Sequence, residues 1–537
     1  MTHPILLGDE AVAQGAIDSG IRGAYAYPGT PSTEIMEFII QSAPQTGIHA
    51  RWSANEKVAY EEALGMSYAG KRSLVIMKHV GLNVAADPFM NSASTGAHGG
   101  LVLAVADDPG MHSSQNEQDS RFYADFAQIP CFEPDSQQTA YDLTREAFIL
   151  SERLQIPVMI RMVTRLSHSR TGVTTAPPDP APTLPPESDW ARWTLVPMNA
   201  RAQYRKLLDK QPEILKATGE SVWNSLRMAP GAKQGIIACG IAGNYVAEQA
   251  EACTPPFSLL MIRGYPFSME SIEALARDCD DILVLEEGYP FVERQVRILC
   301  RSRGIRIRGR LSGDLPRAGE LNPDLVGQAM GIAPRVSYSL PDWPAFPARP
   351  PKLCKGCPHI DFFRAIREVM NEFPGSRPLS DIGCYALGGY PPYNAIVSCV
   401  DMGASISMAK GAAEGGVDHP FAIIGDSTFA HSGMTPLLGA IRENTTMTVC
   451  ILDNGTVAMT GAQETMATGE KLDNIVLGLG VPRENILPFT PLPSRHDDNV
   501  RMLRTAMKTP GLTVVISRRE CVQIAKKNKK SGTGNAP

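Results

Sequence analysis

The sequence has no long apolar run and no marked excess of either charge. None of its hydrophobic stretches approaches the roughly 18 residues that a membrane-spanning helix needs. The N-terminus, MTHPILLGDEAVAQGAIDSG, lacks the basic segment followed by an apolar segment that is typical of a secretory signal. The 51 Lys and Arg residues against 56 Asp and Glu residues give a formal net charge of −5, which is no signature of binding to nucleic acid or to a membrane surface. We therefore expect a cytoplasmic protein that binds neither.

Disulfides are not expected either, although the chain has 11 cysteines, because the cytoplasm keeps thiols reduced. Most of them, such as Cys131, Cys239 and Cys450, lie in or beside apolar runs and are expected to be small buried hydrophobic side chains. Cys354 and Cys357 form a CxxC pair in LCKGCPH. An isolated pair of this kind is compatible with an iron–sulfur cluster, with Zn²⁺ or with reduced thiols.

The chain of 537 residues is too long for one ordinary core, and two to four domains are expected. Apolar runs alternate with helical patterns, which predicts α/β domains with doubly wound, mostly parallel sheets. Two Pro-rich segments, TTAPPDPAPTLPPESD and LPDWPAFPARPPK, predict linkers. The predicted parts are an α/β domain at 1–175, a linker and helical connection at 176–230, a second α/β domain at 231–335, a linker at 336–352, a third α/β domain at 353–525 and a disordered tail at 526–537.

Two polar side chains follow two predicted strands of the third domain. Asp426 comes after FAIIG and Asn454 after TMTVCILD, with a helical pattern between them. The carboxyl ends of parallel strands are where open α/β sheets bind ligands, and Asp and Asn oxygens suit Mg²⁺ together with phosphate oxygens and water. The carbonyl of Thr456 would be a third ligand, and Gly425 would let a phosphate approach the backbone. Asp and Asn are also common turn residues, so the pattern alone leaves both interpretations open.

The same pattern resembles the motif by which thiamine diphosphate enzymes hold their cofactor, usually written GDG with an Asn further along the chain. Ser427 stands where that motif has its second Gly. Such a site also needs a carboxylate that helps to draw the proton from C2 of the thiazolium ring. The candidate is Glu56, at the start of a predicted helix in WSANEKVAYEEALGMSYAG. An acidic residue is also favoured there by the helix dipole alone.

Six segments in order carry a wider resemblance: YPGTPSTEIMEF, the helix that Glu56 begins, LCKGCPH, SDIGCYALG, CVDMGASISMAKG and the GDS…DN motif. Together they resemble the large (alpha) subunit of indolepyruvate:ferredoxin oxidoreductase, a branch of the 2-oxoacid:ferredoxin oxidoreductases, over residues 5–522. The resemblance implies a pyrimidine-binding, a transketolase C-terminal-like and a diphosphate-binding domain. It also implies oxidative decarboxylation of aryl 2-oxo acids to acyl-CoA, with electrons passed to ferredoxin.

The resemblance also implies roles for individual residues. Glu56 matches the glutamate that activates the cofactor's pyrimidine, and Thr30 matches the threonine that faces the substrate. Arg121 loosely matches an arginine near the substrate carboxylate, which a guanidinium fork suits. The ordinary alternatives are a turn residue for Thr30 and a solvent-exposed side chain for Arg121. The matching cofactor positions are Gly403, Gly425, Asp426, Ser427, Asn454 and Thr456, of which Asp426, Asn454 and the Thr456 carbonyl match ligands of Mg²⁺.

Four cysteines stand where the broader family holds a [4Fe–4S] cluster: Cys354, Cys357, Cys384 and Cys521. A Zn²⁺ site and reduced thiols remain the alternatives. The resemblance further implies a small beta subunit as partner, a hetero-oligomer such as α2β2, and coenzyme A as co-substrate.

One feature of the family is missing from this sequence. The family's subunits continue into a ferredoxin-like domain with a CxxCxxCxxxCP run, and no such run precedes Pro537. A truncated chain, a separate subunit that carries the clusters, or a different fate of the electrons would each explain this. The last option gives the alternative function, a non-oxidative thiamine diphosphate-dependent 2-oxo acid decarboxylase or ligase. A non-catalytic subunit that kept the fold is a third hypothesis, against which Glu56, Asp426 and Asn454 argue.

Overall fold

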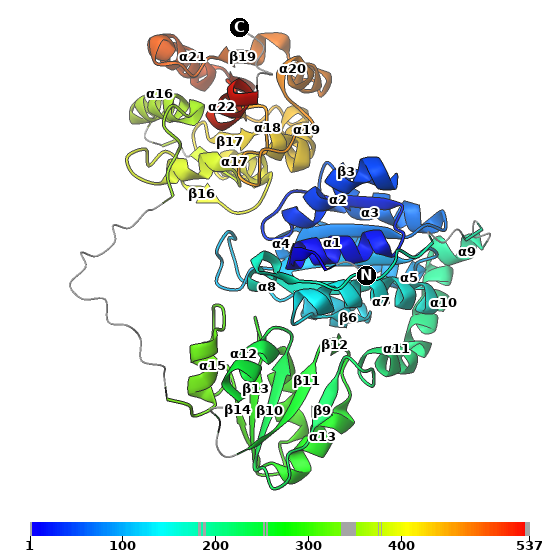
Figure 1. Ribbon diagram of the computed structural model, residues 1–537. Coiled ribbons are helices and arrows are strands. Elements are labelled where there is room, and N and C mark those ends of the chain that lie inside the picture. Colours follow the sequence, from blue (N-terminus) through cyan, green and yellow to red (C-terminus); the bar gives the residue numbers. More distant parts are fainter. Residues whose placement is uncertain are drawn as a thin grey trace. The chain divides into compact units, whose positions relative to one another are not determined.

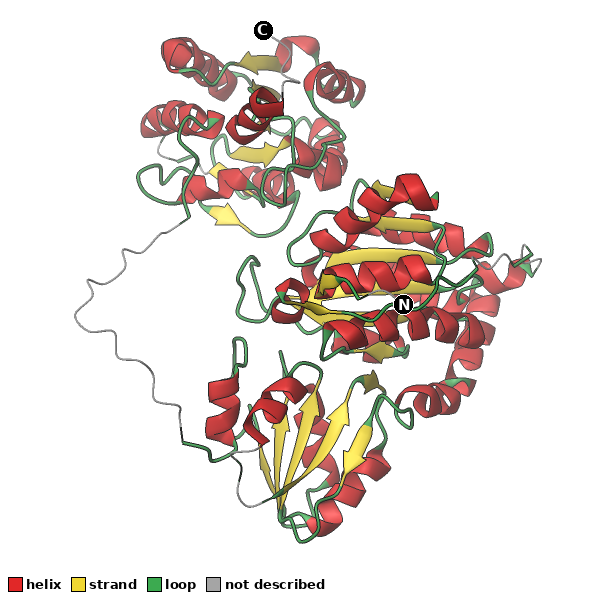
Figure 2. Ribbon diagram, in the orientation of Figure 1, coloured by secondary structure: helices red, strands yellow, loops and turns green. Residues whose placement is uncertain are grey.

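The computed structural model describes residues 3–180, 184–185, 189–250, 253, 256–333, 351–373, 375–376 and 378–531. They belong to two compact units, unit 1 at residues 1–339 and unit 2 at residues 340–537. Each unit consists of helices around mostly parallel sheets, which confirms the predicted fold class (Figures 1 and 2).

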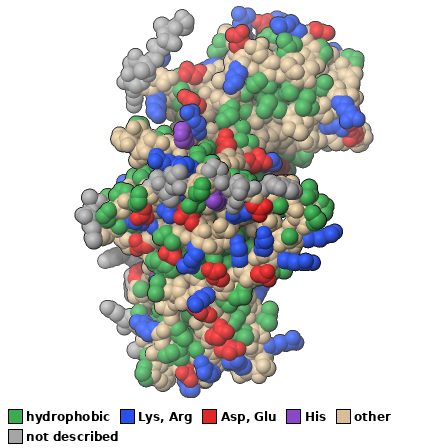
Figure 3. Space-filling view, turned by 90° about the vertical axis from the view of Figure 1, so that its right-hand side faces the viewer, with side chains coloured by type: hydrophobic (Ala, Val, Ile, Leu, Met, Phe, Trp, Pro, Cys, Tyr) green, Lys and Arg blue, Asp and Glu red, His purple; other side chains and the backbone are tan. Residues whose placement is uncertain are grey.

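Among the described residues, no helix combines the length and the apolar character needed to cross a membrane. On the face in Figure 3, acidic and basic side chains are interspersed.

The larger sheet of unit 1 has seven strands. They are β2 (Gly23–Ala26), β3 (His49–Trp52), β4 (Ser73–Lys78), β5 (Leu101–Asp107), β6 (Cys131–Phe132), β7 (Val158–Val163) and β12 (Gly264–Tyr265). The order across the sheet is β12-β6-β7-β5-β4-β2-β3, and every pairing except that of β12 with β6 is parallel. The residues of β4, β5 and β7 are buried throughout, as expected for strands that helices cover on both faces.

The helices around this sheet are α1 (Gly8–Asp18), α2 (Thr33–Thr46), α3 (Glu56–Tyr68), α4 (His79–Val84), α5 (Ala86–Thr95), α6 (Arg121–Ala127), α7 (Gln137–Leu154) and α8 (Thr164–His168). Two short strands, β1 (Ile5–Leu7) and β8 (Arg170–Gly172), pair antiparallel next to α1 and α8. Three helices lead away from this part of unit 1: α9 (Trp190–Trp193), α10 (Pro197–Asp209) and α11 (Gln211–Thr218).

The second sheet of unit 1 has the strand order β14-β13-β10-β11-β9. Its strands are β9 (Ser225–Arg227), β10 (Gln234–Cys239), β11 (Phe257–Ile262), β13 (Asp281–Leu285) and β14 (Arg306–Arg308), and its helices are α12 (Ala242–Gln249), α13 (Met269–Asp278), α14 (Phe291–Leu299) and α15 (Pro323–Ala329). Two strands do not belong to the parts of the chain that the predicted domain boundaries gave them. β9 falls in the predicted connection but joins this sheet, antiparallel to β11. β12 falls in the predicted second domain but pairs with β6 of the first sheet, so one hydrophobic core runs through both predicted domains.

Unit 2 has one six-stranded sheet in which all pairings are parallel. In the order across the sheet, its strands are β16 (Ser398–Cys399), β15 (Pro378–Ser380), β17 (Phe421–Gly425), β18 (Met447–Asp453), β20 (Leu512–Arg518) and β19 (Ile486–Phe489). Successive residues of β17 contribute to two different cores, Ile423 to one and Ile424 to the other. This alternation places a layer of helices on each face of the sheet.

The helices of unit 2 are α16 (Pro358–Glu372), α17 (Ala404–Glu414), α18 (Asp426–Thr428), α19 (Met434–Arg442), α20 (Gly469–Gly478), α21 (His496–Lys508) and α22 (Val522–Ser531), with short turns of other helix types at Cys384–Gly389, Phe429–Gly433, Arg483–Asn485 and Pro493–Arg495. The prediction of a disordered tail from 526 needs correction, because α22 continues to Ser531. Its Ala, Gln and Lys residues have good helix propensity. Residues 532–537, and all but the last two residues of the predicted linker 336–352, lie outside the described residues.

Candidate functional site

Asp426 and Asn454 lie at the carboxyl ends of β17 and β18, two neighbouring strands of unit 2. The Asp426 carboxylate accepts a hydrogen bond from the Ser427 N–H (2.8 Å) and another from the Gly455 N–H (2.9 Å). Because Gly455 follows Asn454 directly, Asp426 is tied to the turn that carries the predicted amide ligand. The structure thus brings the two side chains of the predicted metal site to one turn.

Among the described residues, no ion pair to the buried carboxylate of Asp426 is seen. Burial raises its pKa to about 7, and the neighbouring Asp453 carboxylate acts in the same direction. Hydrogen bonds from backbone N–H groups oppose this rise. Asp453 itself is paired with Arg518 at 2.7 Å. A divalent cation at Asp426 would compensate this buried charge, so the site fits a metal ion.

The other predicted ligands surround the same turn. Asn454 accepts a hydrogen bond from the Thr456 N–H (3.1 Å) through its side-chain oxygen. Thr456 is buried, and its hydroxyl donates to the Gln463 carbonyl (2.9 Å). The hydroxyl oxygen of Ser427 is buried with no hydrogen-bond partner among the described residues. An unsatisfied hydroxyl next to a metal-binding carboxylate fits the oxygen atoms of a diphosphate.

The two predicted glycines are required by close packing. A Cβ on Gly425 would lie 2.7 Å from the ring of Tyr385. Gly403 has φ +92°, and a Cβ there would lie 2.6 Å from the Cβ of Ser432. The Gly403 N–H donates to the buried carboxylate of Asp381, which fixes the start of α17, and the role of Gly403 at the cofactor stays a prediction.

The four predicted cysteines lie near one another in unit 2. Burial raises the pKa of Cys384 to about 12, and the thiols of Cys357, Cys521 and Cys354 contribute to this rise. Burial raises the pKa of Cys357 to about 11, again with contributions from Cys354 and Cys521. The Cys521 N–H donates to the Asn454 carbonyl (3.1 Å), which joins this cysteine group to the turn of the metal site.

The spacing of these thiols bears on the Zn²⁺ alternative. Four sulfur ligands around one Zn²⁺ at 2.3 Å would lie about 3.8 Å apart. Among the described residues, the one group of three or more His, Cys, Asp or Glu ligands within 4.8 Å of one another contains no cysteine. No three of the four thiols therefore lie as close together as a formed zinc site requires, and the [4Fe–4S] cluster on them stays a prediction.

In unit 1, Glu56 is held at the start of α3. The Asn55 side chain caps this helix by accepting a hydrogen bond from the Val58 N–H (2.9 Å). Glu56 is buried, and its side chain packs on Gly81 of α4, where a Cβ would lie 2.6 Å from the Glu56 Cγ and Oε1 atoms. Glu56 therefore has a fixed position near the carboxyl end of β4.

Thr30 lies in the turn between β2 and α2, and its carbonyl accepts a hydrogen bond from the Ser113 hydroxyl (3.2 Å). Lys78, the last residue of β4, packs beside the same turn: a Cβ on Gly29 would lie 3.0 Å from the Lys78 Cδ atom. The Lys78 ammonium donates to the Ser113 carbonyl (3.0 Å). Thr30 and Lys78 are thus connected through one loop, at the edge where β2 and β4 end.

Lys78 is a buried cation that no sequence motif predicted. Burial lowers its pKa from 10.5 to about 8, while the carboxylates of Asp108 and Glu56 oppose the shift. Its one described hydrogen bond leaves two ammonium donors for another group. A buried cation at the ligand-binding edge of a parallel sheet could receive the carboxylate of a 2-oxo acid. The signal in the sequence was a basic residue that closes the apolar strand SLVIMK.

Arg121 belongs to a buried network of charges. Its guanidinium is fully buried, so the alternative of a solvent-exposed side chain is wrong. It donates to Asp119 (2.6 Å) and to the carbonyls of Glu287 (3.0 Å) and Tyr289 (3.1 Å), and it pairs with Glu286 (3.0 Å). These partners come from both predicted domains of unit 1. Arg121 is therefore a structural cation between the two sheets, and this geometry does not fit a role at a substrate carboxylate.

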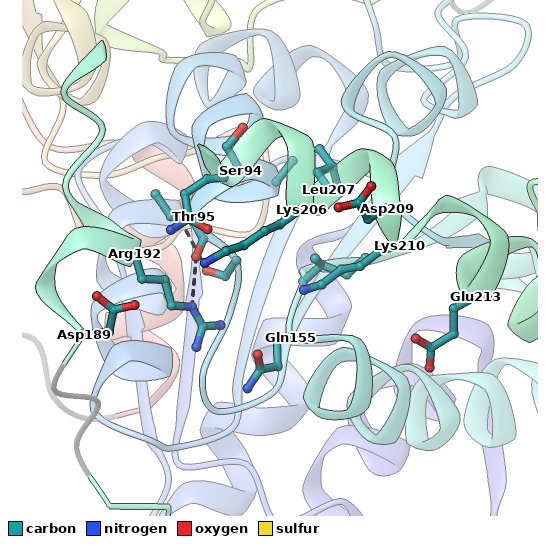
Figure 4. A pocket seen from close by; sticks show the side chains of 14 residues that line it. Ser94, Thr95, Gln155, Asp189, Arg192, Lys206, Leu207, Asp209, Lys210 and Glu213 are labelled. Carbon is teal, nitrogen blue, oxygen red and sulfur yellow. Dashed lines mark hydrogen bonds between the residues drawn. The ribbon is translucent and has the colours of Figure 1, made fainter. Parts of the chain in front are cut away.

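A cavity of about 440 Å³ lies between α5, α9 and α10 and contains none of the predicted site residues (Figure 4). Two of its basic side chains donate to backbone carbonyls. Arg192 donates to the carbonyls of Thr95 (3.2 Å) and Ala97 (2.5 Å), and Lys210 donates to that of Leu154 (2.6 Å). We interpret this cavity as a joint between the first sheet and the connecting helices.

Comparison with known proteins supports the interpretation of both units. The family model described as pyruvate flavodoxin/ferredoxin oxidoreductase, thiamine diP-binding, matches residues 14–202, and the model described as thiamine pyrophosphate enzyme, C-terminal TPP binding domain, matches residues 381–480. The first segment includes Thr30, Glu56 and Lys78, and the second includes Asp426 and Asn454. A solved 2-oxoglutarate:ferredoxin oxidoreductase from Magnetococcus marinus aligns over 57% of this chain and 62% of its own, with 18% identity and a TM-score of 0.48.

Relatives that align over nearly the whole chain carry one name. Indolepyruvate oxidoreductase subunit IorA of Archaeoglobus fulgidus is 38% identical over 545 residues, which are 96% of this chain and 86% of that protein. The subunit of the same name from Thermococcus kodakarensis is 34% identical over 562 residues, 96% of this chain and 85% of that protein. The chain therefore belongs to the indolepyruvate oxidoreductase subunit IorA family, whose members are thiamine diphosphate-dependent 2-oxo acid oxidoreductases.

Proposed function

We propose that this chain is the thiamine diphosphate-binding subunit of an enzyme that oxidatively decarboxylates aryl 2-oxo acids such as indolepyruvate, forms acyl-CoA and passes electrons to ferredoxin. The observation that carries the proposal is the buried Asp426 carboxylate, which forms no ion pair among the described residues and is hydrogen-bonded to the turn of Asn454. The name shared by the relatives supports the aryl substrate.

The cofactor would be held by residues of unit 2. Asp426, Asn454 and the Thr456 carbonyl would bind Mg²⁺, and the Ser427 hydroxyl would donate to a diphosphate oxygen. Glu56 of unit 1 would help to remove the proton from the thiazolium ring. Bound thiamine diphosphate supplies a nucleophilic carbon for the 2-oxo group and an electron sink for decarboxylation.

We further propose that Lys78 takes the role that the sequence suggested for Arg121. Its ammonium would pair with the substrate carboxylate, and Thr30 would face the 2-oxo group. The burial of Lys78, its lowered pKa and its packing against the Thr30 turn support this assignment. A carboxylate in this position would offset the cost of the buried positive charge.

Electrons would leave through a [4Fe–4S] cluster on Cys354, Cys357, Cys384 and Cys521, a proposal that the proximity of the four thiols supports. A small beta subunit would complete the enzyme in a hetero-oligomer such as α2β2, and ferredoxin would be the acceptor.

The test is anaerobic purification of the chain together with its small partner subunit. We expect bound iron with the broad visible absorption of an iron–sulfur cluster, and viologen reduction that requires an aryl 2-oxo acid, coenzyme A and thiamine diphosphate. Indolepyruvate and phenylpyruvate should react faster than pyruvate. Iron-free protein that releases an aldehyde without reducing the dye would refute the oxidative function and favour a non-oxidative decarboxylase.

A further inference from the structure

Three side chains that bind metals well meet in unit 1, one of them buried and the other two partly exposed. Asp9 lies in the first turn of α1, Glu34 in the first turn of α2, and His168 at the end of α8. One ligand atom from each lies within 4.8 Å of the other two. The function proposed above uses none of these residues.

The carboxylate of Asp9 is buried and lacks hydrogen bonds within the described part of the chain, which is unusual for a charged group. Its side chain is fully buried, and neither carboxylate oxygen has a hydrogen-bond partner among the described residues. Burial raises its pKa to about 8, with the Glu34 carboxylate acting in the same direction and His168 opposing it. By comparison, the equally buried Asp107 accepts hydrogen bonds from Ser120 and Arg161. An unsatisfied buried carboxylate is costly unless a cation joins it.

Two more oxygen atoms beside Asp9 are also unsatisfied. Glu34 has one oxygen 3.6 Å from the His168 Nε2 atom, while its other oxygen is buried without a hydrogen-bond partner among the described residues. The buried hydroxyl of Ser167 lies beside Asp9 and opposes the rise in the Asp9 pKa, but it does not come within hydrogen-bond geometry of either carboxylate oxygen. The group therefore offers more acceptor atoms than the described donors around it can satisfy.

Local packing fixes these helices against one another. The Gly8 N–H donates to the Ser169 carbonyl (3.2 Å), and a Cβ on Gly8 would lie 2.2 Å from the Leu166 carbonyl oxygen. Only a glycine allows the start of α1 to approach the end of α8 so closely. The side chains of His168 and Glu34 are 37% and 35% exposed, which leaves an entry path from solvent.

We propose that Asp9, Glu34 and His168 bind a first-row divalent metal ion of the Zn²⁺ or Mn²⁺ type, separate from the Mg²⁺ of the cofactor. One imidazole and two carboxylates form a donor set that such ions accept. Ligand atoms about 2.0–2.2 Å from one ion lie up to about 4.4 Å apart, so small side-chain movements would close the observed group around it. The ion would fasten α1 and α8 to the start of α2, which follows the Thr30 turn.

The test uses the full chain, freed of metal with a chelator and then saturated with Mg²⁺ and thiamine diphosphate. Co²⁺ is titrated into the wild-type protein and into the variants His168→Gln and Asp9→Asn, and bound cobalt is counted after gel filtration. We expect the wild type to retain one equivalent more than either variant. The extra equivalent should show weak visible bands of nitrogen and oxygen ligands, without the intense thiolate bands that cobalt at the cysteines would give.

His496→Gln is the matched control, because His496 also forms a partly exposed pair with a glutamate, Glu368, at 2.9 Å. This variant should bind as much cobalt as the wild type. His168 is partly exposed, so its substitution should leave the fold intact even if Asp9→Asn misfolds. Equal cobalt content and equal spectra in the wild type and His168→Gln would overturn the proposal and identify Asp9 as a protonated structural carboxyl group.

Discussion

Replacing Lys78 with methionine should weaken substrate binding and stabilise the protein at the same time. Methionine keeps the length and the apolar stem of the side chain but removes the charge. If the ammonium pairs with the substrate carboxylate, its loss removes a hydrogen bond to a charged group worth about 1.5–3 kcal/mol. We therefore expect KM for the 2-oxo acid to rise about 10- to 150-fold, while thiamine diphosphate binding stays unchanged.

The expected gain in stability follows from the pKa. A pKa lowered from 10.5 to about 8 means that burial disfavours the charged form by about 3 kcal/mol. This cost is fully present below pH 8, where Lys78 is protonated in both the folded and the unfolded states. It disappears as the pH rises to 10.5, because only the unfolded state then holds the proton. Lys78→Met should therefore raise the free energy of unfolding at pH 7, and its advantage over the wild type should shrink between pH 8 and pH 10.5.

Steady-state kinetics and urea denaturation of the two proteins at several pH values measure both effects. Lys210→Met is the matched control, because Lys210 is also a partly buried lysine whose ammonium donates to a backbone carbonyl and whose pKa is lowered by burial. That variant should leave KM unchanged. A Lys78→Met enzyme that is less stable than the wild type and has an unaltered KM would show that Lys78 is a structural residue.

Variants at four further positions, with one control at Cys399, test the other assignments. Asp426→Asn should reduce affinity for Mg²⁺ and thiamine diphosphate at least about a hundredfold in calorimetric titration; unchanged binding would remove Asp426 from the site. Ser427→Ala and Ser427→Gly should both weaken cofactor binding by about tenfold if the hydroxyl donates to the diphosphate, whereas tighter binding by the glycine variant would mean that Ser427 only replaces a glycine. Arg121→Gln should cost about 3–5 kcal/mol in denaturant unfolding because it leaves buried carboxylates unpaired, with KM unaltered; a raised KM at full stability would restore it to the substrate site. Cys384→Ser should lose iron, and Cys399→Ser, which alters an exposed thiol outside the group of four, should keep it.

The sequence was most informative where a local pattern determines the position of a residue. A strand followed by a polar turn is a local pattern, so Asp426 and Asn454 could be placed at the ends of neighbouring strands, and the structure has them there. The burial of Arg121 could not be predicted, because its partners Glu286, Glu287 and Tyr289 belong to the second sheet. β12 escaped prediction for a similar reason: two residues carry too weak a pattern to show which sheet they join.

The buried charges of this protein fall into two groups, and Arg121 and Lys78 belong to different ones. Arg121 and Arg161 are fully buried, and acidic side chains and carbonyls from both sheets of unit 1 surround them. Such a network is already neutralised and has no capacity left for a ligand. Lys78, Asp426 and Asp9 are also buried, but burial shifts the pKa of each towards its neutral form. The side chains around these three groups do not fully balance their charges. A bound ligand or ion of opposite charge would do so. The same physical criterion therefore separates the structural cation from the three proposed binding sites: a carboxylate for Lys78, Mg²⁺ for Asp426 and a transition-metal ion for Asp9.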